Sequence, residues 1–156
     1  MRVQLDQTDW RILRELQADG RMTNVELARR VGISAPPCLR RVRALEEQGL
    51  IRAYRAHLDA ARLGYPVTAF VMIGLNSQRE ADLAAFAAAA AGWPLVRECH
   101  MVSGETDFLL KCVSPDLATF QDFVIGTLTA AANVDSVRTS LSIRQVKDEP
   151  LLPLEE

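Results

Sequence analysis

The chain has 156 residues, of which 49% are apolar and 24% charged, as in folded globular proteins and unlike disordered chains. This length fits one ordinary domain or two small ones. The net charge of −2 conceals an asymmetry, because residues 1–59 carry a balance of +3 and residues 60–156 a balance of −5. Such a split indicates that the first half meets a polyanion, with chance variation in surface charge as the alternative.

Neither secretion nor membrane insertion is indicated by the sequence. The first residues are charged throughout, unlike a secretory signal. The uncharged run of residues 83–96 is shorter than the roughly 20 residues that a membrane-spanning helix needs. The cysteines are odd in number and lack the spacing of metal ligands; they are Cys38, Cys99 and Cys112. We therefore expect a reduced, cytoplasmic, soluble protein.

Two helices are predicted at the start of the chain. Asp6 can cap a first helix that ends near Gly20, with apolar residues at helical spacing at Ile12, Leu13 and Leu16. Thr23 and Glu26 have the spacing of a capping box, which predicts a second helix that ends at Gly32. The inward positions predicted for this second helix are Val25, Ala28 and Val31.

A third helix is predicted over residues 35–48 in spite of two prolines near its start. Ser34 is its predicted cap, and both prolines fall in the first turn, where a missing N–H removes no intrahelical bond. One face is apolar and consists of Cys38, Val42 and Leu45, with Leu39 at its edge. The opposite face consists of Pro36, Arg40, Arg43 and Glu47, with Arg41 on the flank.

A short helix, a glycine turn and a second helix with an arginine-rich outer face are typical of a helix-turn-helix. The second helix of that motif enters the major groove, where arginine can reach guanine or phosphate. The alternative is a solvated arginine face on a small helical bundle. We favour DNA binding, through Ser34, Pro36, Pro37, Arg40, Arg41 and Arg43. The alternating residues 50–58 then predict a wing-like strand.

A family resemblance supports this interpretation. The runs LDQTDWRILRELQADGRM and TNVELARRVGISAPPCLRRVRALEEQGLIRAY resemble the DNA-binding domain of the Lrp/AsnC family of bacterial and archaeal transcription regulators. In the second half, ECHMVSGETDFLLKCVSPD is similar to the hairpin of the family's effector domain. The resemblance covers all but the last few residues. It implies amino-acid-responsive control of metabolic genes by oligomers that bend or wrap DNA.

The second half begins with a linker, a strand and a helix. Gly64, Tyr65 and Pro66 mark the linker. Residues 67–75 predict a strand that is apolar on both sides, so we expect both faces of its sheet to be covered. Residues 79–91 predict an alanine-rich helix whose inward positions are Leu83, Phe86 and Ala90.

A hairpin, a helix and a last strand complete the predicted pattern. Residues 95–103 and 106–113 form the hairpin, with a turn at Gly104 and Glu105. Ser114-Pro115-Asp116 begins a helix whose apolar positions are Leu117, Phe120, Val124 and Leu128. The last strand, residues 137–146, places Val137, Thr139, Leu141 and Ile143 on one side. The order βαββαβ is the ferredoxin-like arrangement. The predicted fold class is therefore α+β, a winged-helix-like domain followed by a ferredoxin-like domain.

Catalysis is not predicted. Cys99 and His100 are neighbours on a strand, so their side chains point to opposite faces and cannot act together. The sequence has no glycine-rich phosphate loop and no cluster with metal-ligand spacing. We expect no catalytic residue, no metal and no cofactor, and we interpret both histidines as structural.

The effector site follows mainly from the resemblance, which implies an amino acid held between neighbouring dimers beside the turn of the hairpin. The matching residues are Ser103, Gly104, Glu105, Thr106 and Asp107, with Met101, Thr139 and Ser140 as weaker candidates. Free N–H groups of the turn suit a carboxylate, and Asp107 suits an ammonium. The alternative is a plain hairpin turn in which Asp107 accepts local N–H bonds. The family often has Gly-Asp-aromatic-Asp here, where this chain has Gly-Glu-Thr-Asp.

The predicted organisation has a DNA-binding domain over residues 1–59, a linker over 60–66, an effector and oligomerisation domain over 67–150, and a loose tail over 151–156. The predicted function is sequence-specific regulation of amino-acid metabolism genes, modulated by a small amino acid. The alternative is an amino-acid sensor that acts through protein partners without touching DNA. Homodimers are the minimum, since paired reading helices match paired half-sites. Tetramers or octamers are implied by the resemblance alone.

Overall fold

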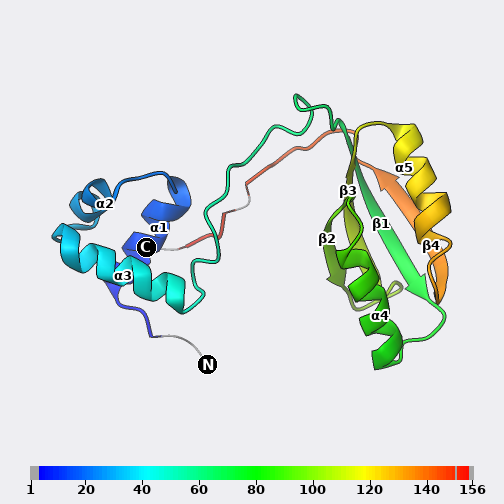
Figure 1. Ribbon diagram of the computed structural model, residues 1–156, viewed down its shortest axis with the longest axis horizontal. Coiled ribbons are helices and arrows are strands. Elements are labelled where there is room, and N and C mark those ends of the chain that lie inside the picture. The colour runs from blue at the N-terminus through cyan, green and yellow to red at the C-terminus, as the bar shows by residue number, and fades with distance from the viewer. Residues whose placement is uncertain (1–3, 150, 155–156) are drawn as a thin grey trace. The chain divides into compact units, whose positions relative to one another are not determined.

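The computed structural model describes residues 4–149 and 151–154 of the chain. The chain divides into two compact units. The first, here called the DNA-binding unit, contains the residues up to His57 together with those from Asp148 onward. The second, the effector unit, is Leu58–Lys147. Figure 1 shows three helices in the first unit and a sheet with its helices in the second.

The helices of the DNA-binding unit are α1 (Gln7–Ala18), α2 (Asn24–Val31) and α3 (Ala35–Glu47). The predicted caps of the first two are confirmed, since Asp6 accepts from the N–H of Asp9 and Thr23 accepts from that of Glu26. A reciprocal capping box forms at Asp6 and Asp9. At Thr23 the box is half made, because the carboxylate of Glu26 bonds two arginines instead.

The inner faces of these helices form one apolar core. Its buried members are Ile12, Leu27, Ala28, Val31, Cys38 and Leu45. The prediction that Val25 points inward is wrong, because its side chain is 71% exposed. Around the helix axis, Ala28 and Val31 mark the buried direction, and Leu27 lies closer to that direction than Val25 does. The buried arc of α2 is therefore shifted toward Leu27.

The segment after α3 does not form the predicted strand. Residues 52–58 carry no regular secondary structure. A strand needs a neighbour to pair with its backbone groups, and none of the strands in the described ranges lies in this unit. The alternating pattern was therefore not sufficient to produce a strand, and the first unit is a three-helix domain in this single chain.

The effector unit has the predicted order of strands and helices. Its elements are β1 (Val67–Leu75), α4 (Glu80–Ala91), β2 (Val96–Met101), β3 (Phe108–Ser114), α5 (Leu117–Phe123), the π-helical η1 (Val124–Leu128) and β4 (Val134–Leu141). The strands pair antiparallel in the order β2-β3-β1-β4. This is the ferredoxin-like arrangement, so the predicted fold class is confirmed.

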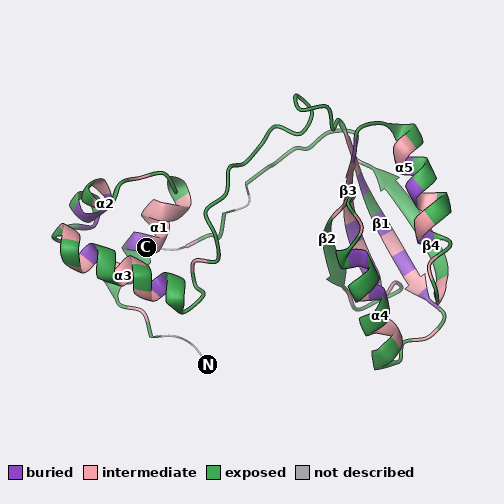
Figure 2. Cartoon of the chain, viewed as in Figure 1, coloured by how far each residue is buried: buried purple, intermediate pink, exposed green. Residues whose placement is uncertain are grey.

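One face of the sheet packs against the helices and the other does not. Alternate residues of β1 and β3 are buried in one core with residues of α4, α5 and η1, and Figure 2 shows this alternation along β1. The opposite face carries Phe70 and Met72 of β1 with Leu109 of β3, all partly or fully exposed. The prediction that both faces are covered therefore fails for the single chain.

Two further element boundaries differ from prediction. The last strand starts at Val134 and ends at Leu141, so Ile143 lies beyond it and is fully exposed. The helix that begins at the predicted Asp116 cap changes to a π-helical turn at Val124. None of the helices in residues 4–149 and 151–154 is long and apolar enough to cross a membrane.

Candidate DNA-binding and effector sites

The turn between α2 and α3 has the geometry of a helix-turn-helix. Gly32 ends α2 with φ 77°, a left-handed conformation that glycine adopts without a Cβ penalty. The side-chain Nδ2 of Asn24 donates to the backbone oxygen of Ala35 over 2.8 Å. This bond ties the first residue of α2 to the first residue of α3, so the two helices are held at their N-termini as well as through the core.

The three arginines predicted to bind DNA differ in their surroundings. Arg40 and Arg43 are exposed, and neither makes an ion pair with any residue in the described ranges. Arg41 is half-buried, and its Nη1 lies 2.7 Å from an oxygen of Asp6 and 2.7 Å from an oxygen of Asp9. Arg40 and Arg43 are thus available to a polyanion, whereas Arg41 joins α3 to the start of α1.

The Asp6–Arg41–Asp9 contact also shifts protonation equilibria. Hydrogen bonds from the carboxylates of Asp9 and Asp6 raise the pKa of Arg41. The backbone N–H of Asp9, followed by the bond from Arg41, holds the pKa of Asp6 below its ordinary value. Both partners are therefore charged at neutral pH, and the contact persists as an ion pair.

Ser34 occupies the predicted cap position of α3, but its side chain makes no capping bond. A cap oxygen accepts from the second or third helical N–H. Counted from Ala35, those positions are Pro36 and Pro37, which have no N–H. The prolines begin the helix, as predicted, and in doing so they remove the donors that Ser34 would need. The exposed hydroxyl of Ser34 is left able to meet another group.

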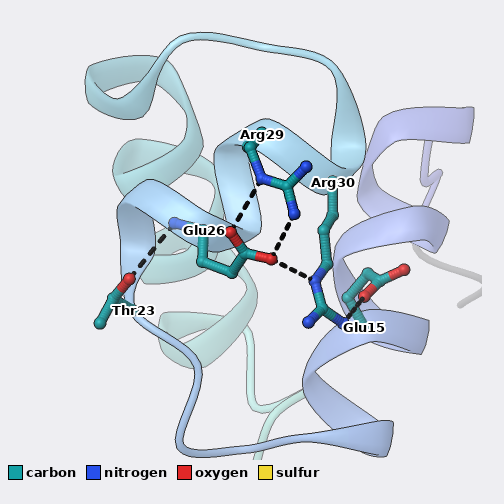
Figure 3. A network of polar contacts seen from close by, with 5 residues as sticks. All are labelled: Glu15, Thr23, Glu26, Arg29 and Arg30. Atoms are coloured by element: carbon teal, nitrogen blue, oxygen red, sulfur yellow. Dashed lines mark hydrogen bonds and ion pairs between the residues drawn. The ribbon is translucent and has the colours of Figure 1, made fainter.

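A network of four charged side chains joins α2 to α1 (Figure 3). The carboxylate of Glu26 accepts two bonds from Arg29, at 2.9 and 2.7 Å, and one from Arg30 at 2.8 Å. Arg30 continues to Glu15 of α1 over 3.1 Å. The bonds from Arg29 and Arg30 lower the pKa of Glu26 to about 2. The i,i+3 and i,i+4 spacing of Glu26, Arg29 and Arg30 could have predicted the part of the network within α2, which the sequence analysis missed, whereas the bond to Glu15 depends on the packing of α1 against α2.

The predicted effector residues surround the hairpin between β2 and β3. Gly104 has φ 135°, which requires glycine at this turn. Asp107 directly precedes β3, and its carboxylate is partly occupied. One oxygen accepts from the backbone N–H of Leu75 over 2.7 Å, and the other accepts from Nε2 of Gln78 over 2.9 Å. Asp107 therefore joins the hairpin to the end of β1, a role that the sequence did not reveal.

The weaker effector candidates do not share one surface. Thr139 lies opposite Val71, on the side of the sheet that faces the helices, whereas Ser140 lies opposite Phe70 on the uncovered side. Met101 is exposed at the end of β2. Glu105 reaches β4 differently, through an ion pair of 3.7 Å with Arg138. The structure thus places the turn beside β4 at Arg138, a residue that the sequence analysis did not select.

The cysteines and histidines form no reactive pair. Cys99 lies opposite Leu110 and His100 opposite Leu109, so their side chains point to opposite faces as predicted. Burial, together with the nearby Cys99, raises the pKa of the Cys112 thiol to about 11. No group of three or more potential metal ligands occurs in the part of the chain that the structure describes.

Comparison with known proteins identifies the family. Residues 5–52 match the model of a winged helix-turn-helix DNA-binding domain, and residues 68–152 match the model of the Lrp/AsnC ligand-binding domain. The chain belongs to the Lrp/AsnC family. The leucine-responsive regulatory protein of Rhizobium meliloti (strain 1021) is 69% identical over 148 residues, which are 95% of each chain. That of Escherichia coli (strain K12) is 42% identical over 143 residues, 92% of this chain and 87% of the relative.

Solved structures agree with this assignment. A transcriptional regulator of Neisseria meningitidis, solved as a complex with L-Met, is 38% identical, has a TM-score of 0.91, and the alignment covers 97% of both chains. An AsnC-family regulator of Agrobacterium tumefaciens has a TM-score of 0.89 at 35% identity, with 96% of this chain and 97% of the other covered. The predicted family is confirmed. This Lrp/AsnC protein is a transcription regulator with a helix-turn-helix DNA-binding domain and an amino-acid ligand-binding domain. The matched relatives are regulators rather than enzymes.

Proposed function

We propose that this Lrp/AsnC regulator reads operators of amino-acid metabolism genes through the outer face of α3. The observation that carries the proposal is that Arg40 and Arg43 are exposed and unpaired within the described ranges, one turn apart on that face. Ser34, Pro36 and Pro37 lie at the N-terminal end of α3, and the hydroxyl of Ser34 makes no capping hydrogen bond. Arg41 belongs to the proposed surface only at its flank, because two carboxylates already hold it.

The test is operator binding by Arg40→Ala and Arg43→Ala variants of the full chain. An arginine that reads a base loses about 1–3 kcal/mol of affinity for the operator, with relaxed specificity at that position. An arginine that touches phosphate weakens all sequences alike and reduces the salt dependence. Arg79→Ala is the matched control, since it removes one exposed charge from the effector unit. Unchanged binding in both α3 variants would refute α3 as the reading helix.

We infer that a small amino acid binds at residues 103–107 and modulates this activity. The turn offers backbone N–H groups for the carboxylate. Asp107 retains acceptor capacity for an ammonium, because each of its oxygens has one donor and can accept a second. Met101, Thr139 and Ser140 remain weaker members of this proposed site.

Thermal-shift measurements with each common amino acid identify the ligand, because a bound ligand stabilises the folded state by mass action. L-Met comes first, since it is the ligand of the Neisseria relative. Calorimetry then compares wild type with Asp107→Asn. Loss of a charge-assisted bond weakens the amino-acid affinity by about 10- to 100-fold, while the control Asp122→Asn leaves it unchanged. If Asp107→Asn bound the amino acid as tightly as wild type, Asp107 would have only a structural role, through its bonds to Leu75 and Gln78.

The partner of the uncovered sheet face is proposed to be a second copy of the chain. Homodimers would pair the reading helices with paired half-sites. The exposed apolar side chains on β1 and β3 support an interface there, whereas tetramers or octamers would need further contacts.

A further inference from the structure

The residues near the C-terminus, predicted to be a loose tail, contact helix α1. Nε2 of Gln17 donates to the backbone oxygen of Leu152 over 2.7 Å, and the N–H of Leu152 donates to Oε1 of Gln17 over 3.1 Å. One amide side chain thus satisfies both backbone groups of one residue. This two-point contact requires an extended segment in one register and one direction, which nonspecific apolar contact would not.

An apolar groove lies beside this segment. It has a volume of about 690 Å³ and is walled by Leu5, Trp10, Leu13 and Leu16 on the α1 side and by residues 50–55 on the other. Leu152 and Leu154 complete its lining. The N–H of Leu154 donates to the oxygen of Leu152 over 2.8 Å, which closes a tight turn around Pro153. Because proline fixes its own φ, this turn is partly preformed before docking.

A second contact lies at the start of the segment. Asp148 Oδ2 is 3.3 Å from Nε2 of His57, the last residue of the preceding part of the DNA-binding unit. Residues from Asp148 onward belong to that same compact unit. The segment is therefore attached at Asp148 and again at Leu152, and every residue that lines the groove lies within one unit.

We propose that α1 and residues 50–55 form a docking site for the chain's own C-terminal segment, residues 148–149 and 151–154, and that this segment completes the DNA-binding domain. The identity of the docked segment follows from the two-point amide contact, from the two leucines that form part of the groove wall and from the Asp148–His57 contact. Docking then gives the effector unit two covalent connections to the DNA-binding domain, one through its first residues and one through the residues after β4.

The consequence for DNA binding runs through α1. Leu152 and Leu154 line the same groove as Trp10 and Leu13 of α1, while the start of α1 holds α3 through Asp6, Asp9 and Arg41. Undocking exposes apolar surface of α1 to water. It therefore destabilises the helix that supports the reading helix.

Trp10 can report on docking of the segment, because it lines the same groove as Leu152 and Leu154 and is one of two tryptophans in the chain. In a Trp93→Phe background its emission follows the DNA-binding unit alone. We expect a shift to longer wavelength and a lower unfolding midpoint in a chain ended after Lys147. A peptide with the sequence of residues 148–156, added in excess, should restore both. Emission that does not respond to removal of the segment would overturn the proposal.

Full-length variants keep the test valid if the shortened chain does not fold. Gln17→Ala and Leu154→Lys should each produce a smaller shift in the same direction. Gln121→Ala, an exposed glutamine on α5, is the matched control and should produce none. Identical emission in Gln17→Ala, Leu154→Lys and the control would count against docking.

A cross-link decides whether the segment docks on its own chain. Cysteines replace Leu16 and Leu152, which both line the groove, so that the Gln17 amide is kept. The Cys99→Ser background removes the exposed native thiol, and a short bis-maleimide joins the two new cysteines. A cross-linked chain that migrates as a monomer in a denaturing gel supports docking within the chain. A covalent dimer, with the segment of a second copy in the groove, would overturn it.

Discussion

The two units solve the problem of burying apolar surface in different ways. The DNA-binding unit closes its core with three helices of its own, and Leu152 and Leu154 of the same chain form part of the wall of its apolar groove. The effector unit buries only one face of its sheet, and Phe70 on the other face is 40% exposed. The comparison teaches that a three-helix core can close within one chain, whereas a four-stranded sheet with helices on one side leaves apolar side chains of its other face exposed.

The largest expected effect tests whether the two cores are independent. Ile12 and Leu110 are both fully buried, one in each unit. Ile12→Ala should destabilise the DNA-binding unit by about 2–5 kcal/mol, and Leu110→Ala the effector unit by a similar amount, because each leaves a cavity. Trp10 and Trp93 lie in different units, so denaturant unfolding of single-tryptophan variants resolves the two transitions. If one substitution lowered the free energy of unfolding by the same amount at both tryptophans, the chain would unfold as a single cooperative unit.

A smaller effect tests the uncovered face of the sheet. Phe70→Lys should weaken self-association by about 2 kcal/mol, roughly 30-fold, because it puts a charge into the apolar interface that we propose. Leu117→Lys is the matched control, since Leu117 is also exposed but lies on α5. Light scattering over a dilution series measures both. A dimer that tolerates Phe70→Lys but not Leu117→Lys would move the interface to the helical side.

A still smaller effect separates the arginines of α3. Arg41→Ala should destabilise the DNA-binding unit by about 0.5–1 kcal/mol, the range for partly exposed ion pairs, because it releases Asp6 and Asp9. Arg40→Ala should leave stability nearly unchanged. Unfolding followed at Trp10 measures the difference, which should shrink in 1 M salt as the pair is screened. A salt-independent loss would instead indicate lost packing of the Arg41 stem.

The smallest expected effect is a pH dependence confined to the DNA-binding unit. Arg29 and Arg30 lower the pKa of Glu26 from 4.5 to about 2 in the folded state. A carboxyl group whose pKa is lower in the folded than in the unfolded state stabilises the fold at pH values above its unfolded pKa. This contribution is lost as the pH falls from about 4.5 toward 2. When unfolding is followed by Trp10 fluorescence, the Glu26→Gln variant should show a smaller change of the unfolding midpoint over this pH range. The midpoint at Trp93 should not respond to the substitution.

Local patterns predicted most elements correctly, because their causes are local. Asp6, Thr23 and Gly32 act on the backbone within a few residues of themselves, and the apolar spacing of α3 needs only its own helix. The strand expected after α3 failed because a strand is completed by a neighbour rather than by its own alternation. Val25 was misplaced because the direction from which two other helices approach α2 fixes its buried arc.

The sequence by itself determined the family, the ferredoxin-like order of elements and the arginine face of α3, since each depends on residue type and spacing. Tertiary structure alone decided how the members of that face differ. Arg41 meets the carboxylates of Asp6 and Asp9 across 35 and 32 positions of sequence, while Arg40 and Arg43 meet none within the described ranges. It also decided that Gln17 holds Leu152, 135 positions away. Such contacts form only where packing brings two surfaces together, and the spacing of residues along the chain does not say which distant residues will be close in space.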